Sequence, residues 1–314
     1  MEQFAIGIDL GGTRVKLGLV CGDKLIAKAV IPARANEGLA ASLPFIEKEI
    51  NTMLFAHHVP LSALSGIGLG FPGLVDPKQQ KVLSTNKKYD DALNVDLAAW
   101  VAKCWGVQFF MDNDARMAAV GEWKYGAGKG TDNLVVMTIG TGIGTSAIIE
   151  GKLLRGKHFQ AGCLGGHLSV DYKGAVCTCG NIGCMEAHAG TWSIKQRVME
   201  STNYAQSNMA SADVIDFETL FREARNNDPL AQQIKNDCLD IWAAGMVNLI
   251  HAYDPEVMVI GGGVLNNKDE VMPYLMDKVR KHAWCPWGDV AIRPTSLLSD
   301  AGIFGVVHCL HNDV

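Results

Sequence analysis

The chain has no apolar run long enough to cross a bilayer and no excess of basic residues. Its formal net charge of −5 gives no electrostatic reason to expect a nucleic acid or an anionic membrane as partner. No linker, low-complexity tract or heptad repeat interrupts the 314 residues, so we expect one large domain or two ordinary ones. The first residues contain neither a basic segment nor an apolar signal core, and we expect a cytoplasmic protein.

The cysteines do not follow the pattern of a disulfide framework. There are nine, an odd number, and this favours a reducing compartment such as the cytosol. Three of them lie close together, in a Cys-x-Cys-Gly-x-x-Gly-Cys run. The other six are scattered along the chain: Cys21, Cys104, Cys163, Cys238, Cys285 and Cys309.

The cysteine run predicts a structural zinc site. Cys177, Cys179 and Cys184, with His167 upstream, offer three thiolates and an imidazole, which close a tetrahedral shell with no open position. The glycines between the cysteines let the backbone curl so that the sulfurs converge. The alternative is three buried, unliganded thiols, since free cysteine packs as a small apolar residue. We favour zinc, because thiols this close to one another and to a histidine rarely lack a metal.

Two glycine-rich turns follow buried strands. Strand 4–9 runs into Leu10-Gly11-Gly12-Thr13, and strand 134–139 runs into Gly140-Thr141-Gly142. Such turns expose backbone N–H groups to a phosphate. Gly-Thr recurs at one constant offset, as does Lys-Leu at 24–25 and 152–153, which predicts an internal duplication. Two turns facing each other across a cleft would hold a polyphosphate from both sides.

Further polar positions stand at the ends of predicted strands. Strand 67–69 leads into Gly70-Phe71-Pro72-Gly73, and strand 107–111 leads into Asn113-Asp114-Ala115. Asp114 is well placed for chemistry, although this local pattern taken alone favours a helix N-cap. Other predicted elements are helix 44–54, a helix that begins at Asp228-Pro229 and ends before Asp254, strand 256–260 with Gly261-Gly262-Gly263 behind it, and a last helix at 300–310.

These motifs together resemble the ROK family (repressor, open reading frame, kinase) of sugar kinases, and the matches span nearly the whole chain. The resemblance implies an α/β fold, the duplicated actin-like (ribonuclease H-like) fold with two lobes and a central cleft. The smaller lobe would comprise 1–116, with the helix at 300–314 packing back on it. The larger lobe, 117–299, would carry the zinc module and the nucleotide site.

The same resemblance implies ATP-dependent phosphorylation of a hexose or hexose derivative at the 6-hydroxyl, with glucose as the default substrate. Asp114 would be the general base and Asp9 would hold Mg²⁺ through water. His167 would bind zinc through one ring nitrogen and face the sugar with the other. Sugar contacts would come from Gly73, Asn86, Asn113, Asp114, His167 and Glu186, and nucleotide contacts from Asp9, Gly11, Gly12, Thr13, Gly140, Thr141, Gly142, Gly262 and Gly263.

Three positions depart from the family pattern. Leu164 stands where the family usually has a glutamate that reaches the sugar, so recognition of a hydroxyl should weaken or change. Arg116 replaces a frequent Asn, and Arg14 replaces a common Lys. The substrate therefore stays open among glucose, N-acetylmannosamine, N-acetylglucosamine, fructose and allose.

A catalytically inactive sugar-binding sensor or a ROK-type regulator is a remoter alternative. Regulators of the family carry a helix-turn-helix ahead of the first strand, and here that strand is expected within the first few residues. The expected partners are a sugar and ATP, and by resemblance a second copy of the chain in a homodimer.

Overall fold

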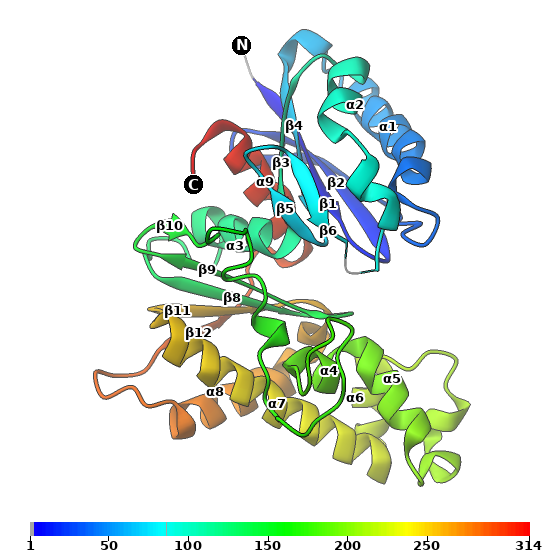
Figure 1. Cartoon of the computed structure of the whole chain (residues 1–314), viewed down its shortest axis with the longest axis vertical. Helices are drawn as coiled ribbons and strands as arrows, with labels where there is room; N and C mark the ends of the chain where they lie inside the picture. Colours follow the sequence, from blue (N-terminus) through cyan, green and yellow to red (C-terminus); the bar gives the residue numbers. More distant parts are fainter. Residues whose placement is uncertain (1–2, 86) are drawn as a thin grey trace. The chain divides into compact units, whose positions relative to one another are not determined.

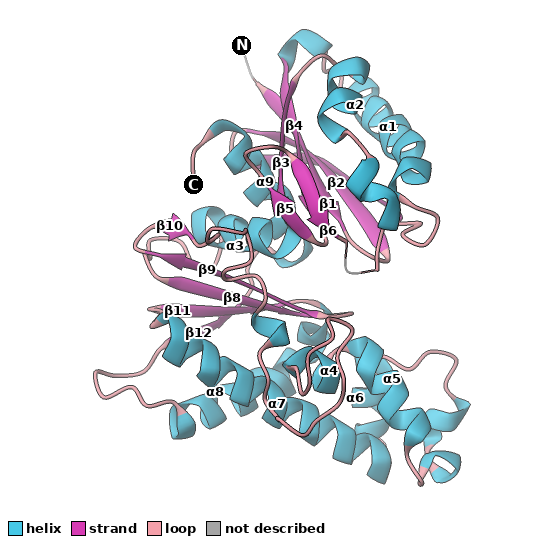
Figure 2. Cartoon of the chain, in the orientation of Figure 1, coloured by secondary structure: helices cyan, strands magenta, loops and turns pink. Residues whose placement is uncertain are grey.

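The computed structural model describes residues 3–85 and 87–314, which form two compact units. The first unit comprises 1–131, 150–163 and 296–314, and the second comprises 132–149 and 164–295. The first unit thus includes 117–131 and 150–163, which the sequence analysis assigned to the larger lobe. Each unit is built around a β-sheet with helices packed against it (Figures 1 and 2).

The sheet of the first unit has the strand order β3-β2-β1-β4-β7. β1 pairs antiparallel with β2 and parallel with β4, and β4 pairs parallel with β7. Ile6, Ile8 and Leu10 of β1 are fully buried, as expected for a short apolar strand. The bounds are β1 Phe4–Leu10, β2 Arg14–Cys21, β3 Lys24–Pro32, β4 Leu64–Phe71 and β7 Gln108–Asn113, with a small hairpin of β5 Leu74–Asp76 and β6 Lys81–Ser84.

The first helix begins earlier than its sequence predicts. Helix α1 spans Leu39–Ala56, so the predicted start at Pro44 is wrong. The side chain of Asp91 accepts hydrogen bonds from the backbone N–H groups of Leu39, at 2.6 Å, and Ala40, at 2.9 Å. This carboxylate supplies the cap that the local sequence lacks, because Gly38 at the N-cap position has no side chain to accept them.

Helices α3, Asp114–Tyr125, and α9, Ala301–His311, pack tightly against each other in the first unit. A Cβ on Gly305 would lie 1.7 Å from the carbonyl oxygen of Met117, so only glycine permits this approach. Helix α9 also packs on β1 and β4, while helix α2, Leu97–Cys104, packs on β7. The tight α3–α9 contact fixes the helix that starts at Asp114.

The second unit repeats the sheet of the first. Its strands β9, β8, β11 and β12 follow the order and orientations of β2, β1, β4 and β7, with an antiparallel hairpin followed by two parallel pairings. The repeat agrees with the predicted duplication. The bounds are β8 Leu134–Ile139, β9 Ile143–Ile149, β11 Val257–Gly261 and β12 Ala291–Pro294, and the two-residue strand β10, Lys152–Leu153, comes after β9 in the chain.

The longest helix of the second unit, α7, spans Pro229–Tyr253, as predicted. Asp228 caps it by accepting a hydrogen bond from the N–H group of Ala231 at 2.8 Å, and Pro229 takes the first helical position. The other helices are α4 Met185–Ala189, α5 Thr191–Glu200, α6 Phe217–Arg225 and α8 Lys268–His282. Within 3–85 and 87–314, no helix combines the length and the apolar character that a membrane crossing demands.

Candidate active site and metal centre

Asp114 lies where β7 ends and α3 begins. The N-cap of α3 is Asn113, whose side-chain oxygen accepts from the N–H group of Arg116 at 3.1 Å, so the capping role does not fall to Asp114. The side-chain amide of Asn113 donates to the carbonyl oxygen of Gly73 and to Oδ1 of Asp114, both at 3.0 Å. Three of the predicted sugar-site residues are therefore in direct contact.

The carboxylate of Asp114 has one occupied and one open oxygen. Oδ1 also accepts from the N–H group of Ala115 at 2.7 Å, whereas Oδ2 accepts no hydrogen bond from the described residues. Burial raises the pKa of Asp114 from 3.8 to about 6, and the negative charge of Asp9 adds to this rise. Lys88 and Lys16 oppose it. A carboxylate with a pKa of about 6 and a free oxygen can accept a proton near neutral pH.

Asp9 lies near the end of β1, opposite Lys16 of β2, whose ammonium is 2.7 Å from Oδ2 of Asp9. The turn that follows is closed by a hydrogen bond from the N–H group of Gly11 to the carbonyl oxygen of Arg14, at 3.0 Å. Thr13 and Arg14 are exposed. The ion pair with Lys16 leaves Oδ1 of Asp9 available to a hydrated cation.

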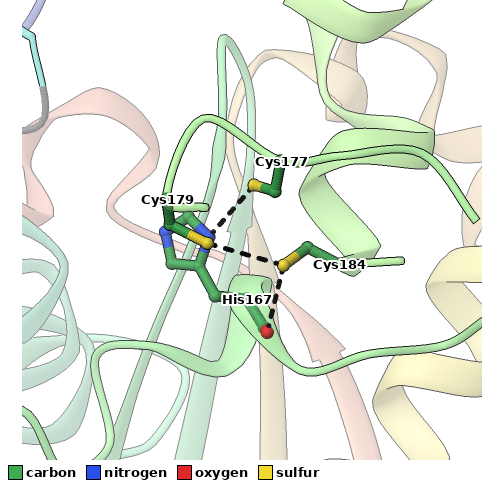
Figure 3. A group of neighbouring side chains, drawn as sticks. All are labelled: His167, Cys177, Cys179 and Cys184. Atoms are coloured by element: carbon green, nitrogen blue, oxygen red, sulfur yellow. Dashed lines mark hydrogen bonds between the residues drawn. The ribbon is translucent and has the colours of Figure 1, made fainter. Parts of the chain in front are cut away.

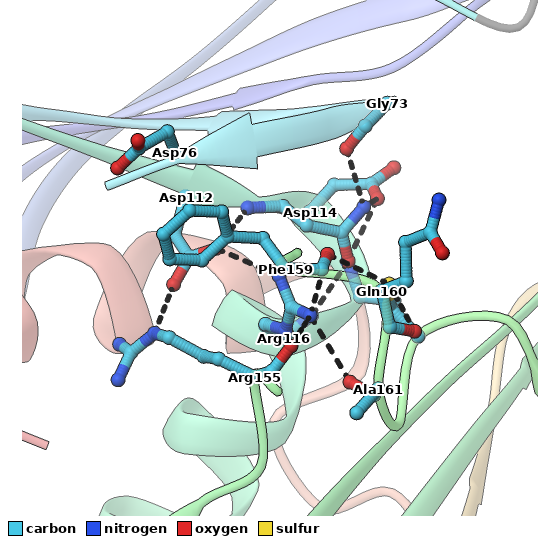
Figure 4. Close-up of polar contacts among 12 residues, drawn as sticks. Gly73, Asp76, Asp112, Asp114, Arg116, Arg155, Phe159, Gln160 and Ala161 are labelled. Carbon is cyan, nitrogen blue, oxygen red and sulfur yellow. Dashed lines mark hydrogen bonds and ion pairs between the residues drawn. The ribbon is translucent and has the colours of Figure 1, made fainter. Parts of the chain in front are cut away.

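Arg116, one of the departures from the family pattern, is completely buried on α3. Its guanidinium is 3.2 Å from Oδ1 of Asp112 and donates to the carbonyl oxygens of Phe159 at 2.9 Å and Ala161 at 3.0 Å (Figure 4). Arg155 pairs with the other oxygen of Asp112 at 2.9 Å. The buried pair therefore fixes the loop at 154–163 to the helix that carries Asp114.

In the second unit, the turn after β8 packs against α4 and α5. The carboxylate of Glu186 accepts from the N–H group of Ile143 at 2.7 Å and from the indole of Trp192 at 3.3 Å. A Cβ on Gly142 would lie 2.4 Å from Oε2 of Glu186. Glu186 therefore supports the Gly140–Gly142 turn as well as standing close to the cysteine run.

Gly262 and Gly263 follow β11, as predicted. Gly262 has a φ of 92°, and a Cβ there would lie 2.2 Å from the carbonyl oxygen of Ile139. A Cβ on Gly263 or Gly140 would meet no atom within 4 Å, so the backbone is open at both positions. The structure thus offers bare backbone at the ends of neighbouring strands β8 and β11, where α/β folds bind nucleotides.

The four predicted zinc ligands converge. One ligand atom from each of His167, Cys177, Cys179 and Cys184 lies within 4.8 Å of the others (Figure 3). Nδ1 of His167 is 3.5 Å from the sulfur of Cys177, and the sulfurs of Cys179 and Cys184 are 3.7 Å apart. A tetrahedral zinc shell has sulfur–nitrogen and sulfur–sulfur edges of about 3.5 and 3.8 Å, so the donor set and its spacing fit the metal.

Neighbouring groups hold this cluster in place. Burial, followed by the hydrogen bond between Cys184 and Cys179, raises the pKa of Cys184 to about 12, so a cation among the sulfurs is needed to ionise this thiol at neutral pH. The amide of Asn181 lies 3.4 Å from the sulfur of Cys184. Gly165 donates its N–H group to Oγ1 of Thr145 at 2.8 Å, which ties the short turn carrying His167 to β9.

The structure also places three further residues, His188, Lys16 and Lys88, at or near these sites. His188, on α4, accepts from the N–H group of Ala175 at 3.3 Å and supports the loop before Cys177. The positive charges of Lys16 and Lys88 both lower the pKa of Asp114. The strand register places Lys16 opposite Asp9 and could have indicated it, whereas no local pattern indicates Lys88. Asn86, a predicted sugar contact, lies outside the described residues.

Comparison with known proteins identifies the family. The sequence model of the ROK family matches residues 5–312, so the chain belongs to the ROK family, as its motifs predict. The glucokinase of Thermotoga maritima is 31% identical over 307 residues, covering 96% of this chain and 95% of that protein. The xylose repressor of Bacillus subtilis is 26% identical over 309 residues, covering 96% of this chain and 76% of the repressor.

A solved structure supports the same relationship. The ROK family glucokinase from Streptomyces griseus, crystallised in complex with glucose and AMPPNP, superposes with a TM-score of 0.77 at 26% identity. The comparison covers 98% of each chain. The chain therefore has the fold of the ROK sugar kinases along nearly its whole length.

Proposed function

We propose that this protein is a sugar kinase that transfers the γ-phosphoryl group of ATP to a hydroxyl of a hexose or hexose derivative, with the 6-hydroxyl of glucose as the default acceptor. The observation that carries the proposal is Asp114, whose pKa is raised to about 6. Its Oδ1 is held by the Asn113 amide and the N–H group of Ala115, while its Oδ2 accepts no hydrogen bond from the described residues. Full-length similarity to two glucokinases supports it.

In the proposed reaction, Asp114 accepts the proton of the sugar hydroxyl as its oxygen attacks phosphorus and ADP leaves. Phosphoryl transfer depends mainly on positioning and on neutralising charge, so one carboxylate beside the nucleophile is sufficient. Asp9 would hold Mg²⁺, which supplies positive charge to the phosphates. The backbone at 11–13 and 140–142 would contact phosphates, and Gly262 and Gly263 would border the adenosine.

The cysteine cluster would hold a structural zinc ion. Nδ1 of His167 faces the sulfur of Cys177, so a metal there would fix the tautomer with the proton on Nε2. Nε2 would then donate a hydrogen bond to a sugar hydroxyl, and Glu186 would accept one. The zinc would act by fixing these two side chains rather than by entering the chemistry.

The identity of the sugar substrate depends on the residue at position 164, which is leucine in this chain. Its side chain is 37% exposed and immediately precedes the turn that carries His167. An apolar group there cannot accept a hydrogen bond, so a hydroxyl or acyl group recognised at this point differs from the one that a glutamate would bind. N-acetylmannosamine, N-acetylglucosamine, fructose and allose therefore remain candidate substrates beside glucose.

The proposal is tested by measuring ADP release over aldohexoses, ketohexoses and N-acylated hexosamines. The wild-type chain should turn over at least one sugar, and Leu164→Glu should shift the preference, with gain of glucose activity marking a specificity switch. Leu168 is a second exposed leucine, four residues further along the chain, and Leu168→Glu serves as the control. This variant should leave the sugar preference unchanged.

Sugar binding without ATP consumption by the wild-type chain would contradict the kinase proposal. That result would favour the sensor or regulator alternative, to which the similarity with a xylose repressor also points. The cytoplasm remains the expected compartment and a homodimer the expected assembly.

A further inference from the structure

Lys88 lies directly against the first glycine-rich turn. A Cβ on Gly12 would lie 2.9 Å from Cε and 3.4 Å from Nζ of Lys88. Gly12 does not adopt a positive φ, so its backbone conformation does not demand glycine. The missing side chain at Gly12 therefore makes room for Lys88, whose ammonium lies beside the turn proposed to bind phosphate.

The backbone of Lys88 is anchored to the same turn. Tyr89 is fully buried with a φ of 56°, and its hydroxyl is 3.0 Å from the carbonyl oxygen of Gly11 and 2.9 Å from that of Ala33. The N–H group of Tyr89 donates to the carbonyl oxygen of Ala35 at 3.0 Å. A left-handed conformation in a bulky residue is unfavourable and persists only where its surroundings enforce it. These contacts hold the lysine over Gly12.

The ammonium of Lys88 is available to an anion. Lys16, the other lysine of this region, is neutralised by Asp9 at 2.7 Å. Across 3–85 and 87–314, by contrast, no carboxylate forms an ion pair with Lys88, and its side chain is half-buried. A half-buried cation without a carboxylate ion-pair partner among the described residues, held beside the glycine-rich turn, forms a binding place for phosphate oxygens.

We propose that Lys88 is a catalytic residue that binds the transferred phosphoryl group; this inference rests on the proposed kinase function. As the bond from the sugar oxygen to phosphorus forms and the bond from phosphorus to the ADP oxygen breaks, the sugar proton passes to Asp114. The ammonium of Lys88 neutralises charge on the non-bridging oxygens throughout.

Lys88 has a second effect on the same reaction. The charged groups that act on the pKa of Asp114 are Asp9 on β1, Lys16 on β2 and Lys88, the residue before Tyr89. Lys88 lowers the pKa of Asp114 against burial and Asp9, which keeps the base deprotonated at neutral pH. Removal of this one charge should therefore raise the pKa of Asp114.

The first test compares Lys88→Met and Lys88→Arg with Lys87→Met, which removes an exposed neighbouring lysine. Lys88→Met should lower kcat roughly 10²–10³-fold with little change in the KM of the sugar, and Lys88→Arg should recover part of the loss. In the pH profile of kcat/KM, the midpoint of the acid limb should lie at a higher pH in Lys88→Met than in the wild type. The midpoint should be unchanged in Lys87→Met. Wild-type turnover in Lys88→Met would overturn the inference and leave the kinase function intact.

The second test needs no sugar, so it separates the proposed role of Lys88 from the proposed kinase function. The affinities for AMPPNP and ADP are measured by calorimetry with Mg²⁺. Lys88→Met should weaken the binding of AMPPNP by roughly tenfold or more and the binding of ADP far less. Gly12→Ala, which displaces the lysine stem, should show the same selective loss. Equal effects on both nucleotides, or none, would overturn the role of Lys88, whereas failure of the wild-type chain on every sugar would overturn the kinase function.

Discussion

Replacement of Asp114 by Asn should lower turnover sharply while making the protein more stable at neutral pH. The amide keeps an oxygen that can accept from Ala115 and Asn113, as Oδ1 does now at 2.7 and 3.0 Å. It cannot take the sugar proton, so kcat should fall roughly 10²–10⁴-fold, the usual contribution of a general base.

The stability gain follows from the pKa of Asp114, which folding raises from 3.8 to about 6. A carboxyl group whose pKa is higher in the folded than in the unfolded state binds its proton more tightly in the folded state. The protein therefore loses stability as the pH rises from the pKa of the unfolded state through the pKa of the folded state. At about 1.4 kcal/mol for each pKa unit, the ionised group costs the folded state about 3 kcal/mol above pH 7 and about 1 kcal/mol at pH 4.5. Asn carries no such penalty.

The assay is urea unfolding of the wild-type and Asp114→Asn proteins at pH 4.5, 6 and 8, beside ADP release at pH 8. The difference in unfolding free energy should grow by roughly 2 kcal/mol over this range. Asp213→Asn, an exposed aspartate of the second unit, is the matched control and should change neither measurement. A pH-independent difference, or appreciable turnover by Asp114→Asn, would refute the reasoning.

Two further predictions concern the buried ion pair and the metal centre. Arg116→Met removes one of the two cations paired with Asp112 and the donor to the carbonyl oxygens of Phe159 and Ala161, so urea unfolding should show a loss of about 3–5 kcal/mol. Arg280→Met, which breaks an exposed pair with Asp289, should cost less than about 1 kcal/mol, and equal losses would contradict the buried-pair account. Cys184→Ser should lower bound zinc, measured by elemental analysis, from about one ion per chain towards none and weaken sugar binding, whereas Cys21→Ser should retain the metal. Full zinc content in Cys184→Ser would contradict the assigned ligand set.

The sequence predicts the parts of this fold that depend on local pattern. Buried strands such as β1 and β8 follow from short apolar runs that end in glycine-rich turns. The helix between Asp228 and Tyr253 follows from its capping residues, and the converging cysteines follow from their close spacing. These features need no knowledge of distant segments, because the residues that define them are neighbours in the chain.

Features that depend on distant contacts were not predictable. The start of α1 is set by Asp91, about fifty residues further on, and Arg116 is buried by carbonyl groups of the 155–161 loop. Lys88 reaches Gly12 because a buried tyrosine turns the chain in a left-handed conformation. No pattern of residue types near these positions encodes such contacts.

The most direct measurement of the central claim is a phosphorus-31 NMR spectrum of the wild-type protein incubated with MgATP and each sugar of the panel. The account predicts a sugar phosphate monoester that appears together with ADP in equal amounts, and at most a trace of it from Asp114→Asn over the same incubation time. ADP accompanied only by inorganic phosphate, or an unchanged ATP spectrum with every sugar, would contradict it.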